Sequence, residues 1–483
     1  MIQLNKLLSA LNIPFSEGVS EIHRVVFDSR LANENTLFVA IEGVSVDGHS
    51  FLQQVADQGC QYAIIQRSVD VPGGMRCFQV PDTRIALAEL ACFWYDYPSK
   101  ELTLVGITGT NGKTTTATLL FNLFTQLGYK TGLISTVVNK IGEEQVPATH
   151  TTPDPFALNE LLRNMVDSGC AYCFMEVSSH AVHQQRIHGL EFCGGVFTNI
   201  THDHLDYHQT FAEYIKAKKG FFDSLPPTAF ALTNRDDKNG EVMLQNTLAD
   251  KRTYALNSMA DFKGLILENE LSGLVMRLNT LEVHTRLIGA FNAYNLLAVY
   301  GVGMLLKVPS LELLTAMSTL EPVEGRFQFF KSAHGVTVVV DYAHTPDALE
   351  NVLKTIGVFR KATQKVITII GCGGDRDKAK RPEMAAIAQK LSSQVLLTSD
   401  NPRTENPSEI LKEMQAGVDS SSSTPVLLIE DRAQAIQTAS LLAGSTDIVL
   451  IAGKGHEKYQ EIMGVKYPFD DFELASQFFN KNR

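Results

Sequence analysis

The sequence is organised around one stretch, Thr108-Gly109-Thr110-Asn111-Gly112-Lys113-Thr114-Thr115. Residues 102–107 before it are apolar and typical of a buried strand, and apolar residues at helical spacing follow it. A glycine loop between a strand and a helix N-terminus binds anions, because backbone N–H groups and the positive helix end point at the ligand. Lys113 adds a full charge, and Thr114 places a hydroxyl where phosphate loops bind Mg²⁺. The stretch therefore predicts a nucleotide-binding loop.

The glycine spacing of this loop differs from that of the standard phosphate loop. The standard motif has its first glycine at the position that Ile107 occupies here, and the nearest glycines are Gly106 and Gly109. The difference predicts a loop of an unusual subtype. Because a chance Gly-Lys-Thr rarely falls between a strand and a helix, we interpret the loop as a phosphate site.

Composition excludes several classes of protein. The chain has 483 residues, 44% hydrophobic and 20% charged, with a net charge of −11. Nucleic-acid binding needs a basic surface, so no nucleic-acid partner is expected. The apolar runs are far shorter than the roughly 18 residues of a membrane span, and the N-terminus lacks a signal-peptide pattern. Seven scattered cysteines indicate a reducing compartment. We expect a cytoplasmic protein without a membrane partner, acting as a monomer.

The chain divides into three units, as its length predicts. The first covers residues 1–98 and ends near Tyr97-Pro98-Ser99. Residues 99–332 alternate strands and helices around the loop, which predicts a central parallel-sheet P-loop ATPase domain. Residues 333–483 repeat the alternation and predict a C-terminal Rossmann-like domain. The predicted fold class is α/β with three domains.

Polar clusters follow the predicted strands of the second and third units. Residues 176–180 and 201–208 follow two strands of the second unit. Residues 341–344, 373–376, 400–403 and 453–457 follow four strands of the third unit. Ligands of open parallel sheets bind beyond the carboxyl ends of the strands, so these clusters predict one site. Glu176 is a candidate Mg²⁺ ligand, because Mg²⁺ prefers carboxylates, waters and phosphates.

Two motifs favour structural interpretations. Cys170 and Cys173 have the spacing of redox and zinc sites, but no second pair follows, and their apolar strand favours buried thiols. The glycines of residues 371–376 lack the third glycine of the dinucleotide fingerprint, so NAD binding is rejected.

A histidine cluster resembles a metal site. It comprises His202, Asp203, His204, Asp206 and His208. Zinc needs three or four convergent ligands. Near a phosphate site we instead expect one histidine to act at the metal–phosphate group and the others to bond locally.

Together these residues resemble the Mur ligase family. The motifs lie in the second and third units, at residues 109–115, 176–180, 203–204, 289–295, 325–326 and 341–344, and the resemblance covers essentially the whole chain. Residues 373–376 and 400–403 resemble those of the family variant that adds meso-diaminopimelate during peptidoglycan precursor synthesis. The resemblance thus implies a role in cell-wall growth and cell division. The resemblance implies that ATP converts the D-glutamyl carboxylate of UDP-N-acetylmuramoyl-L-alanyl-D-glutamate into an acyl phosphate. The amine of diaminopimelate then displaces phosphate.

The resemblance also implies the residues that bind ATP and Mg²⁺. The catalytic set is Lys113, His204 and Lys218, the last as a carbamate, with Lys219 as the fallback. A carbamate presents carboxylate oxygens to Mg²⁺, which a bare ammonium cannot, and the implied metal ligands are Thr114, Glu176 and Lys218. The implied ATP-binding residues are Gly109, Thr110, Asn111, Gly112, Lys113, Thr114, Thr115, Asn292, Asn295, Arg326, Asp341 and His344.

Two further residue sets are implied for the other substrates. Hydroxyl, amide and guanidinium groups suit the anionic nucleotide sugar. The implied nucleotide-sugar residues are Phe27, Ser29, Val44, Ser45, Val46, Thr151, Thr152, Ser178, Gln184 and Arg186. The implied diaminopimelate residues are Arg376, Asp400, Asn401, Pro402, Arg403, Gly453 and Glu457. Arg403 would clamp the distal carboxylate that lysine lacks, although residues 401–403 also fit a simple helix start.

Three other functions remain open from the sequence. Folylpolyglutamate synthase shares the loop subtype but would lack the N-terminal unit and the Asp-Asn-Pro-Arg stretch. A small-molecule kinase would leave phosphate on its substrate, and a regulatory nucleotide-binding module would do no chemistry. Phosphate release that depends on both the nucleotide sugar and diaminopimelate fits only the ligase.

Overall fold

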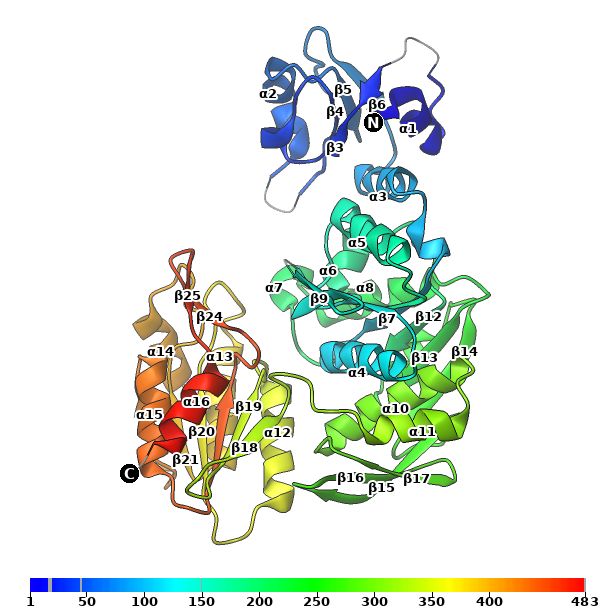
Figure 1. The fold of residues 1–483 in the computed structure, drawn as a ribbon. Coiled ribbons are helices and arrows are strands. Elements are labelled where there is room, and N and C mark those ends of the chain that lie inside the picture. The colour runs from blue at the N-terminus through cyan, green and yellow to red at the C-terminus, as the bar shows by residue number, and fades with distance from the viewer. Residues whose placement is uncertain (16–19, 44–45, 149, 482–483) are drawn as a thin grey trace.

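The computed structural model describes residues 1–15, 20–43, 46–148 and 150–481, and it contains three units (Figure 1). In Figure 1 the N-terminal unit lies above the central unit, and the C-terminal unit lies beside the central one. The predicted α/β class with a mostly parallel central sheet is confirmed. Among the described residues no helix is long and apolar enough to cross a membrane.

The N-terminal unit is built on a parallel sheet with the order β3-β4-β5-β6. Leu37 and Val39 of β4 face a core shared with α1 and α3, whereas Phe38 faces the core on the α2 side, as the period of two in a strand requires. The elements are β1 (Ile2–Gln3), α1 (Leu4–Ala10), β2 (Glu21–Ile22), β3 (Arg24–Val26), η1 (Ser29–Leu31), β4 (Thr36–Val39), η2 (Gly48–Phe51), α2 (Leu52–Asp57), β5 (Tyr62–Ile65), β6 (Arg76–Gln79), α3 (Thr83–Trp94) and η3 (Pro98–Lys100).

The central unit surrounds β7 (Thr103–Thr108), which continues through the glycine loop into α4 (Lys113–Gln126). Val105 and Ile107 of β7 enter the core under α4 and α10, and Leu104 enters the core on the opposite face of the sheet. The first half of the unit contains β8 (Thr131–Ile134), β9 (Val138–Ile141), β10 (Glu144–Pro147), α5 (Pro155–Asp167), β11 (Tyr172–Glu176), α6 (Ser179–His183), β12 (Gly194–Phe197), α7 (Leu205–His208) and α8 (Phe211–Asp223).

The sheet of the central unit has the order β10-β9-β8-β11-β7-β12-β13-β14-β15-β16-β17 in the described chain. The strands from β8 through β11 and β7 to β15 pair in parallel, and antiparallel strands extend both edges. The second half contains β13 (Phe230–Asn234), α9 (Gly240–Met243), β14 (Asp250–Ala255), β15 (Phe262–Glu270), β16 (Gly273–Leu278), β17 (Leu281–Thr285), α10 (Ala290–Leu305) and α11 (Ser310–Ser318).

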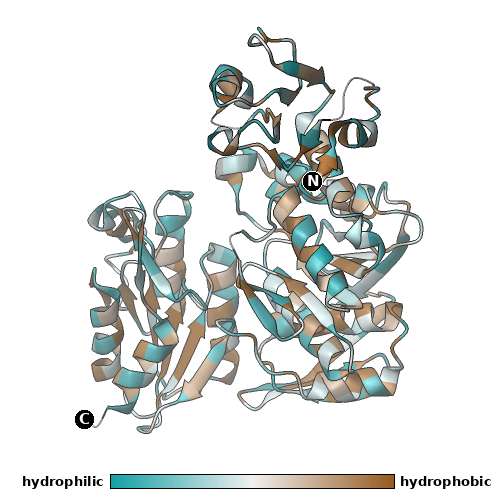
Figure 2. Cartoon of the chain, turned by 45° about the horizontal axis from the view of Figure 1, so that its top comes forward, coloured by the Kyte–Doolittle hydropathy of each residue, from teal (hydrophilic) through white to brown (hydrophobic). Residues whose placement is uncertain are grey.

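The C-terminal unit is a doubly wound sheet with the order β18-β19-β23-β20-β21-β22. Helices α12, α13 and α14 pack on one face, and α15 and α16 on the other. Figure 2 shows hydrophobic residues along the strands between them. The elements are β18 (Gln328–Lys331), β19 (Thr337–Asp341), α12 (Pro346–Phe359), β20 (Val366–Ile370), α13 (Lys380–Leu391), β21 (Gln394–Leu397), α14 (Pro407–Gln415), β22 (Val426–Leu428), α15 (Arg432–Leu442), β23 (Ile448–Ala452), β24 (Tyr459–Ile462), β25 (Val465–Pro468) and α16 (Asp471–Asn480).

One strand lies ahead of the predicted start of the third unit. β18 precedes residue 333, yet it pairs antiparallel with β19 and so belongs to the C-terminal sheet. The remaining pairs of this sheet are parallel, so the carboxyl ends of β19, β20, β21 and β23 meet at one edge. The polar clusters of the sequence follow these four strands.

Candidate active site

A cavity of about 770 Å³ runs between the central and C-terminal units. The carboxyl ends of β7, β11 and β12 open into it from the central unit, and those of β19, β20, β21 and β23 from the C-terminal unit. The predicted site residues that line it are Thr110, Asn111, Gly112, Lys113, Thr114, Thr115, Thr151, Thr152, Glu176, Ser178, Arg186, His204, Lys218, Asn295, Arg326, Asp341, His344, Arg376, Asp400, Asn401, Arg403, Gly453 and Glu457.

Several predicted residues lie outside the lining of this cavity. Phe27 is exposed and Ser29 begins η1, both in the N-terminal unit, and Val46 is exposed as well. Val44 and Ser45 lie outside the described residues. The remaining four are neighbours of lining residues. Gln184 accepts hydrogen bonds from Arg186, Asn292 accepts one from Asn295, and Gly109 and Pro402 belong to the lining loops.

The glycine loop is shaped by its glycines and by strand β12. Gly109 has a φ of +151°, and a Cβ there would collide with the Thr198 hydroxyl, so glycine is required. Ile107, at the first-glycine position of the standard motif, is fully buried in β7. The loop is therefore shorter than the standard one because the strand extends into it. The Asn111 N–H donates to Asn199 Oδ1 over 2.9 Å and fixes the loop to the end of β12.

Lys113 folds back onto its own loop. Its Nζ donates to the carbonyl oxygens of Gly109 over 2.9 Å and Thr110 over 2.7 Å. Burial lowers the pKa of Lys113, and the carboxylates of Glu176 and Asp203 oppose that effect. An ammonium has three N–H donors, so Lys113 keeps one for an anion bound at the loop.

Glu176 ends β11 and is fully buried. Its Oε1 accepts the Thr136 N–H over 2.7 Å, and its Oε2 accepts the Thr136 hydroxyl over 3.2 Å. A carboxylate oxygen can accept more than one hydrogen bond, and Glu176 lines the cavity. Thr136 was not predicted, because 40 residues separate it from Glu176 and no local pattern relates the two.

Lys218 is a buried lysine on α8, with 1% of its surface exposed. Its Nζ donates to the Gly109 carbonyl over 2.7 Å and lies 4.7 Å from the centre of the Tyr214 ring. Burial holds the pKa of Lys218 well below its usual value, and the charge of Lys113 lowers it further. Lys219, by contrast, points away and forms an ion pair of 2.6 Å with Asp223. Of the two lysines, Lys218 alone lines the cavity.

The histidine cluster separates into different environments. His208 Nε2 lies 2.9 Å from the Ser179 hydroxyl and is buried, whereas His202 is exposed. His204 lines the cavity, and its Nε2 lies 3.5 Å from Asp203 Oδ2. Its backbone is left-handed, with a φ of +56°. Burial lowers the pKa of His204 to about 3, so the imidazole is neutral near neutral pH. Within the described residues no group of three or more His, Cys, Asp or Glu side chains is placed to hold a metal ion.

Arg326 and Asp341 lie at the junction of the two units. Arg326 Nη2 donates to the Thr114 hydroxyl over 3.2 Å, and its guanidinium lies 4.3 Å from the centre of the Tyr342 ring. Its buried Nε has no hydrogen-bond partner among the described residues, so one donor remains for a ligand. Asp341 accepts the N–H groups of Phe327 and Ala343 over 2.6 and 2.7 Å, and burial raises its pKa.

A second contact joins the units across the cavity. The Asn111 side chain donates to Asp347 Oδ2 over 2.9 Å, from the glycine loop to the first turn of α12. Burial raises the pKa of Asp347. Asp347 was not predicted, since no local pattern in the sequence relates it to a loop 236 residues away.

The C-terminal edge of the cavity surrounds a buried lysine. Lys454 Nζ lies 3.8 Å from Asp400 Oδ1 and donates to Asn401 and Glu457 over 3.1 Å each. Glu457 Oε2 also accepts a hydrogen bond from Asn401 Nδ2 over 2.7 Å. Burial and the charge of Asp400 raise the pKa of Glu457. Lys454 belongs to the predicted polar cluster of residues 453–457, but no role was predicted for it. A lysine within a glycine turn after an apolar strand was the available signal.

Two arginines complete this edge. Arg403 Nη1 donates to the Gly374 carbonyl over 2.7 Å, and Arg403 has a φ of +51°. Arg376 is exposed and lies on the loop that follows β20. Both line the same cavity as Lys113. The site therefore combines a phosphate loop with two guanidinium groups that suit carboxylates.

Known protein families match all three units. The Mur ligase family catalytic domain matches residues 21–95, the Mur ligase middle domain residues 107–303, and the Mur ligase glutamate ligase domain residues 325–455. The chain belongs to the Mur ligase family. The resemblance stated from the motifs is thereby confirmed, and the cavity lies between the middle and C-terminal domains of a Mur ligase.

Individual Mur ligases match over the full length. The UDP-N-acetylmuramoyl-L-alanyl-D-glutamate–2,6-diaminopimelate ligases of Cytophaga hutchinsonii and Phocaeicola vulgatus are 55% and 51% identical, over 97% and 99% of both chains. A solved structure of a ligase of the same name has a TM-score of 0.69 at 31% identity and covers 99% of each chain. A Mycobacterium tuberculosis folylpolyglutamate synthase structure shares the fold at 18% identity and a TM-score of 0.63, and covers 77% of this chain.

Proposed function

We propose that this Mur ligase uses ATP to join meso-diaminopimelate to the D-glutamate of UDP-N-acetylmuramoyl-L-alanyl-D-glutamate. One observation carries the proposal: a single cavity is lined by the glycine loop, by Thr152, Ser178 and Arg186, and by Arg403. The names of the full-length relatives support the same reaction. The N-terminal unit, which folylpolyglutamate synthase was expected to lack, favours the nucleotide-sugar substrate over that alternative.

The first step is phosphoryl transfer to the substrate carboxylate. A carboxylate oxygen attacks the γ-phosphorus of ATP, the bond from that phosphorus to the β,γ-bridging oxygen breaks, and ADP leaves. The two anions repel each other, so the reaction needs positive charge at the phosphates. Lys113 supplies it from the loop and Arg326 from the C-terminal side, where its buried Nε has no partner among the described residues. Neutral His204 serves as a hydrogen-bond partner near the phosphates.

The donor set of the cavity suits Mg²⁺. The Thr114 hydroxyl and the Glu176 carboxylate are hard oxygen ligands, and Mg²⁺ completes its shell with waters and substrate phosphates. When bound, Mg²⁺ would neutralise charge that develops on the transferred phosphoryl group. Lys218 fits this role only as a carbamate. Burial lowers the pKa of its amine, which favours the neutral form that reacts with CO₂, and the product would bear oxygens at the loop.

The second step is amide formation. The amine of diaminopimelate attacks the acyl carbon, the bond to the phosphate oxygen breaks, and the amine loses a proton. Positioning the amine and the acyl phosphate together accounts for much of the rate. Arg403 and Arg376 are proposed to hold the carboxylates of diaminopimelate, with Asp400, Asn401, Gly453 and Glu457 around its ammonium groups; Pro402 shapes the turn.

The remaining predicted residues are assigned to the other two ligands. The nucleotide sugar is proposed to extend from Thr151, Thr152, Ser178, Gln184 and Arg186 toward Phe27, Ser29 and Val46. The nucleoside of ATP is proposed to lie near Asn292, Asn295, Asp341 and His344. The seven cysteines are free thiols, which supports the cytoplasmic location proposed for the enzyme. The monomeric state stays a prediction.

Isotope transfer tests this mechanism. The D-glutamyl carboxylate of the nucleotide sugar is labelled with heavy oxygen and incubated with enzyme, ATP, Mg²⁺ and diaminopimelate. The acyl phosphate predicts one labelled oxygen in each inorganic phosphate released, together with the tripeptide product. Unlabelled phosphate beside the tripeptide would overturn the acyl-phosphate route.

A further inference from the structure

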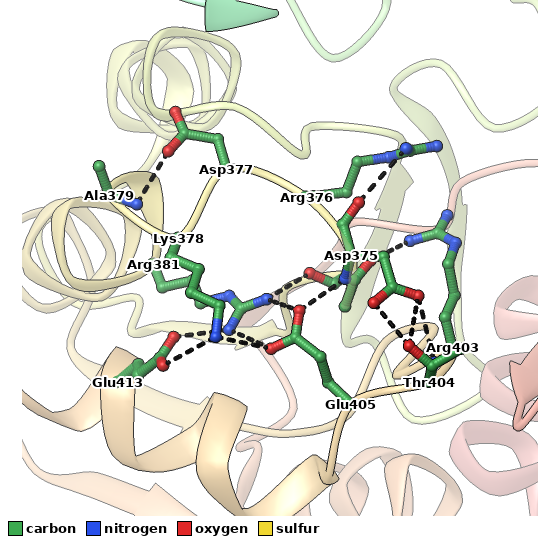
Figure 3. Close-up of polar contacts among 12 residues, drawn as sticks. Asp375, Arg376, Asp377, Lys378, Ala379, Arg381, Arg403, Thr404, Glu405 and Glu413 are labelled. Atoms are coloured by element: carbon green, nitrogen blue, oxygen red, sulfur yellow. Dashed lines mark hydrogen bonds and ion pairs between the residues drawn. The ribbon is translucent and has the colours of Figure 1, made fainter. Parts of the chain in front are cut away.

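Arg381 is a fully buried arginine on α13 that the proposed mechanism does not use. Its Nη1 donates to Glu405 Oε2 over 2.9 Å and to Glu413 Oε2 over 2.5 Å. Its Nη2 donates to Glu405 Oε1 over 2.9 Å and to the Gly373 carbonyl over 3.1 Å. Figure 3 shows this guanidinium between the two glutamates. A buried, bidentate carboxylate pair fixes geometry as well as charge.

Glu405 extends this network to the loop that carries Arg376. Its Oε1 also accepts the Asp375 N–H over 2.6 Å, and Asp375 in turn accepts the Thr404 hydroxyl over 2.7 Å. The loop of residues 373–376 and the loop of residues 401–405 are therefore bound to each other through side chains at their tips. The Arg381 hydrogen bond is the largest cause of the pKa of Glu405 falling to about 2, so Glu405 is charged near neutral pH.

The backbone of the two loops is tightly constrained. Arg403 and Asp375 have φ values of +51° and +53°, a region that residues other than glycine rarely occupy. A Cβ on Gly374 would collide with the Pro402 carbonyl, so the loops touch through their backbones. Such conformations persist only where the surroundings over-determine them. The bonds from Arg381, Glu405 and Thr404 supply that constraint.

We propose that Glu405 is a positioning residue that sets amino-acid selectivity by holding Arg376 and Arg403 at a fixed separation. The inference rests on the proposed function, since it assumes that these arginines bind the carboxylates of diaminopimelate. Arg403 Nη1 is itself anchored to Gly374, next to Asp375. Figure 3 shows both guanidinium groups on the side of the network opposite Glu413, and both line the cavity.

Glu413 provides a matched control for Glu405. Both carboxylates form ion pairs with Arg381 and with Lys378. Only Glu405 also accepts an N–H from the loop of Arg376, because Glu413 lies on α14, away from that loop. A role in stability alone predicts variants that change the free energy of unfolding but leave the KM for diaminopimelate unchanged. A positioning role predicts an effect on amino-acid binding for Glu405 only.

The test compares Glu405→Gln with Glu413→Gln in the full-length enzyme. The amide keeps the shape of the side chain but turns one oxygen toward Arg381 into an N–H donor. For Glu405→Gln we expect the KM for diaminopimelate to rise about tenfold or more, because small misplacements of binding groups are costly. Its preference for diaminopimelate over L-lysine should fall in proportion, with the KM for ATP unchanged. Glu413→Gln should keep the KM for diaminopimelate and the preference over L-lysine within about twofold of wild type.

A surface variant guards against misfolding. Thr404→Val removes the exposed hydroxyl bond to Asp375 but leaves Arg381 and both glutamates intact, and we expect a rise of about threefold in the KM for diaminopimelate. A Glu405→Gln enzyme that folds and selects diaminopimelate as well as wild type overturns the inference alone, as does an equal effect of Glu413→Gln. A wild-type enzyme that ligates no diaminopimelate overturns the proposed function and the inference with it.

Discussion

The side-chain Nζ of Lys218 donates a 2.7 Å hydrogen bond to the main-chain carbonyl of Gly109. This bond connects α8 to the glycine loop, where the phosphates of ATP are proposed to lie. Since Lys113 donates to the same carbonyl over 2.9 Å, two lysines converge on one oxygen. Burial and the charge of Lys113 both lower the pKa of Lys218, which favours the neutral amine that carbamate formation requires.

Replacing Lys218 should therefore slow ligation strongly. For Lys218→Ala we expect kcat to fall about 100-fold or more, since a metal ligand that stabilises transferred charge supplies several kcal/mol. The matched control is Lys219→Ala, whose lysine pairs with Asp223 outside the cavity and should be dispensable. Native mass spectrometry of the wild type should show the added mass of one CO₂, lost in Lys218→Ala. An active Lys218→Ala enzyme would contradict the assignment.

Replacing Arg403 should weaken one substrate selectively. We expect Arg403→Ala to raise the KM for diaminopimelate by about 30-fold or more, because it leaves a substrate carboxylate unpaired. The KM values for ATP and for the nucleotide sugar should stay near wild type. Arg360→Ala, at the exposed end of α12, serves as the control. Steady-state kinetics with each substrate varied checks the claim, and unchanged diaminopimelate kinetics would refute it.

A buried ion pair should dominate the stability of the C-terminal unit. The side chains of Arg432 and Asp471 are both fully buried, and Arg432 Nη2 lies 2.7 Å from Asp471 Oδ2. Arg432 also donates to the Ala452 carbonyl at the end of β23. Asp471→Ala should lower the free energy of unfolding by about 3–5 kcal/mol, since it leaves an unpaired buried charge. Glu350→Ala, which breaks an exposed pair with Lys354, should change it by under about 0.5 kcal/mol. Hydrogen exchange of the β23 amides measures the free energy of unfolding of both variants. Equal losses in Asp471→Ala and Glu350→Ala would contradict the prediction.

The Glu405–Arg381 pair should make stability depend on acid pH. In the folded state the pKa of Glu405 falls from 4.5 to about 2, and the hydrogen bond that Glu405 accepts from Arg381 is the largest cause. The unfolded chain thus binds the proton first as the pH falls. The stabilisation is complete above about pH 4.5 and is lost as the pH approaches 2.

Comparison with a non-titrating variant isolates this effect. The difference in unfolding free energy between wild type and Glu405→Gln should be constant near neutral pH and should narrow as the pH falls below the unfolded pKa. Urea titrations over the acid range in which the fold persists measure it. A difference that does not change with pH would show that the Glu405 charge contributes nothing.

Much of the site could be predicted from local sequence patterns. The strand before Thr108, the glycine loop and the helix from Lys113 are contiguous, so periodicity and spacing were enough to recognise them. The clusters after β19, β20, β21 and β23 follow the same logic, since parallel strands place their carboxyl ends at one edge.

What the sequence missed depends on contacts between distant residues. Thr136 reaches Glu176 across 40 residues, and Asn111 reaches Asp347 across 236. The burial of Lys218 arises from packing that brings α8 onto the loop, and no periodicity reports it. The antiparallel strands β9, β10, β16 and β17 were also missed, because an alternation of strands and helices predicts only parallel pairing.

The most direct test of the account is the release of inorganic phosphate from ATP by the purified enzyme with Mg²⁺. The reaction is run with the nucleotide-sugar dipeptide alone, with diaminopimelate alone, with both, and with neither. The account predicts sustained release only when both substrates are present, with one tripeptide formed per phosphate. Release without diaminopimelate, or phosphate that stays on a substrate, would contradict it.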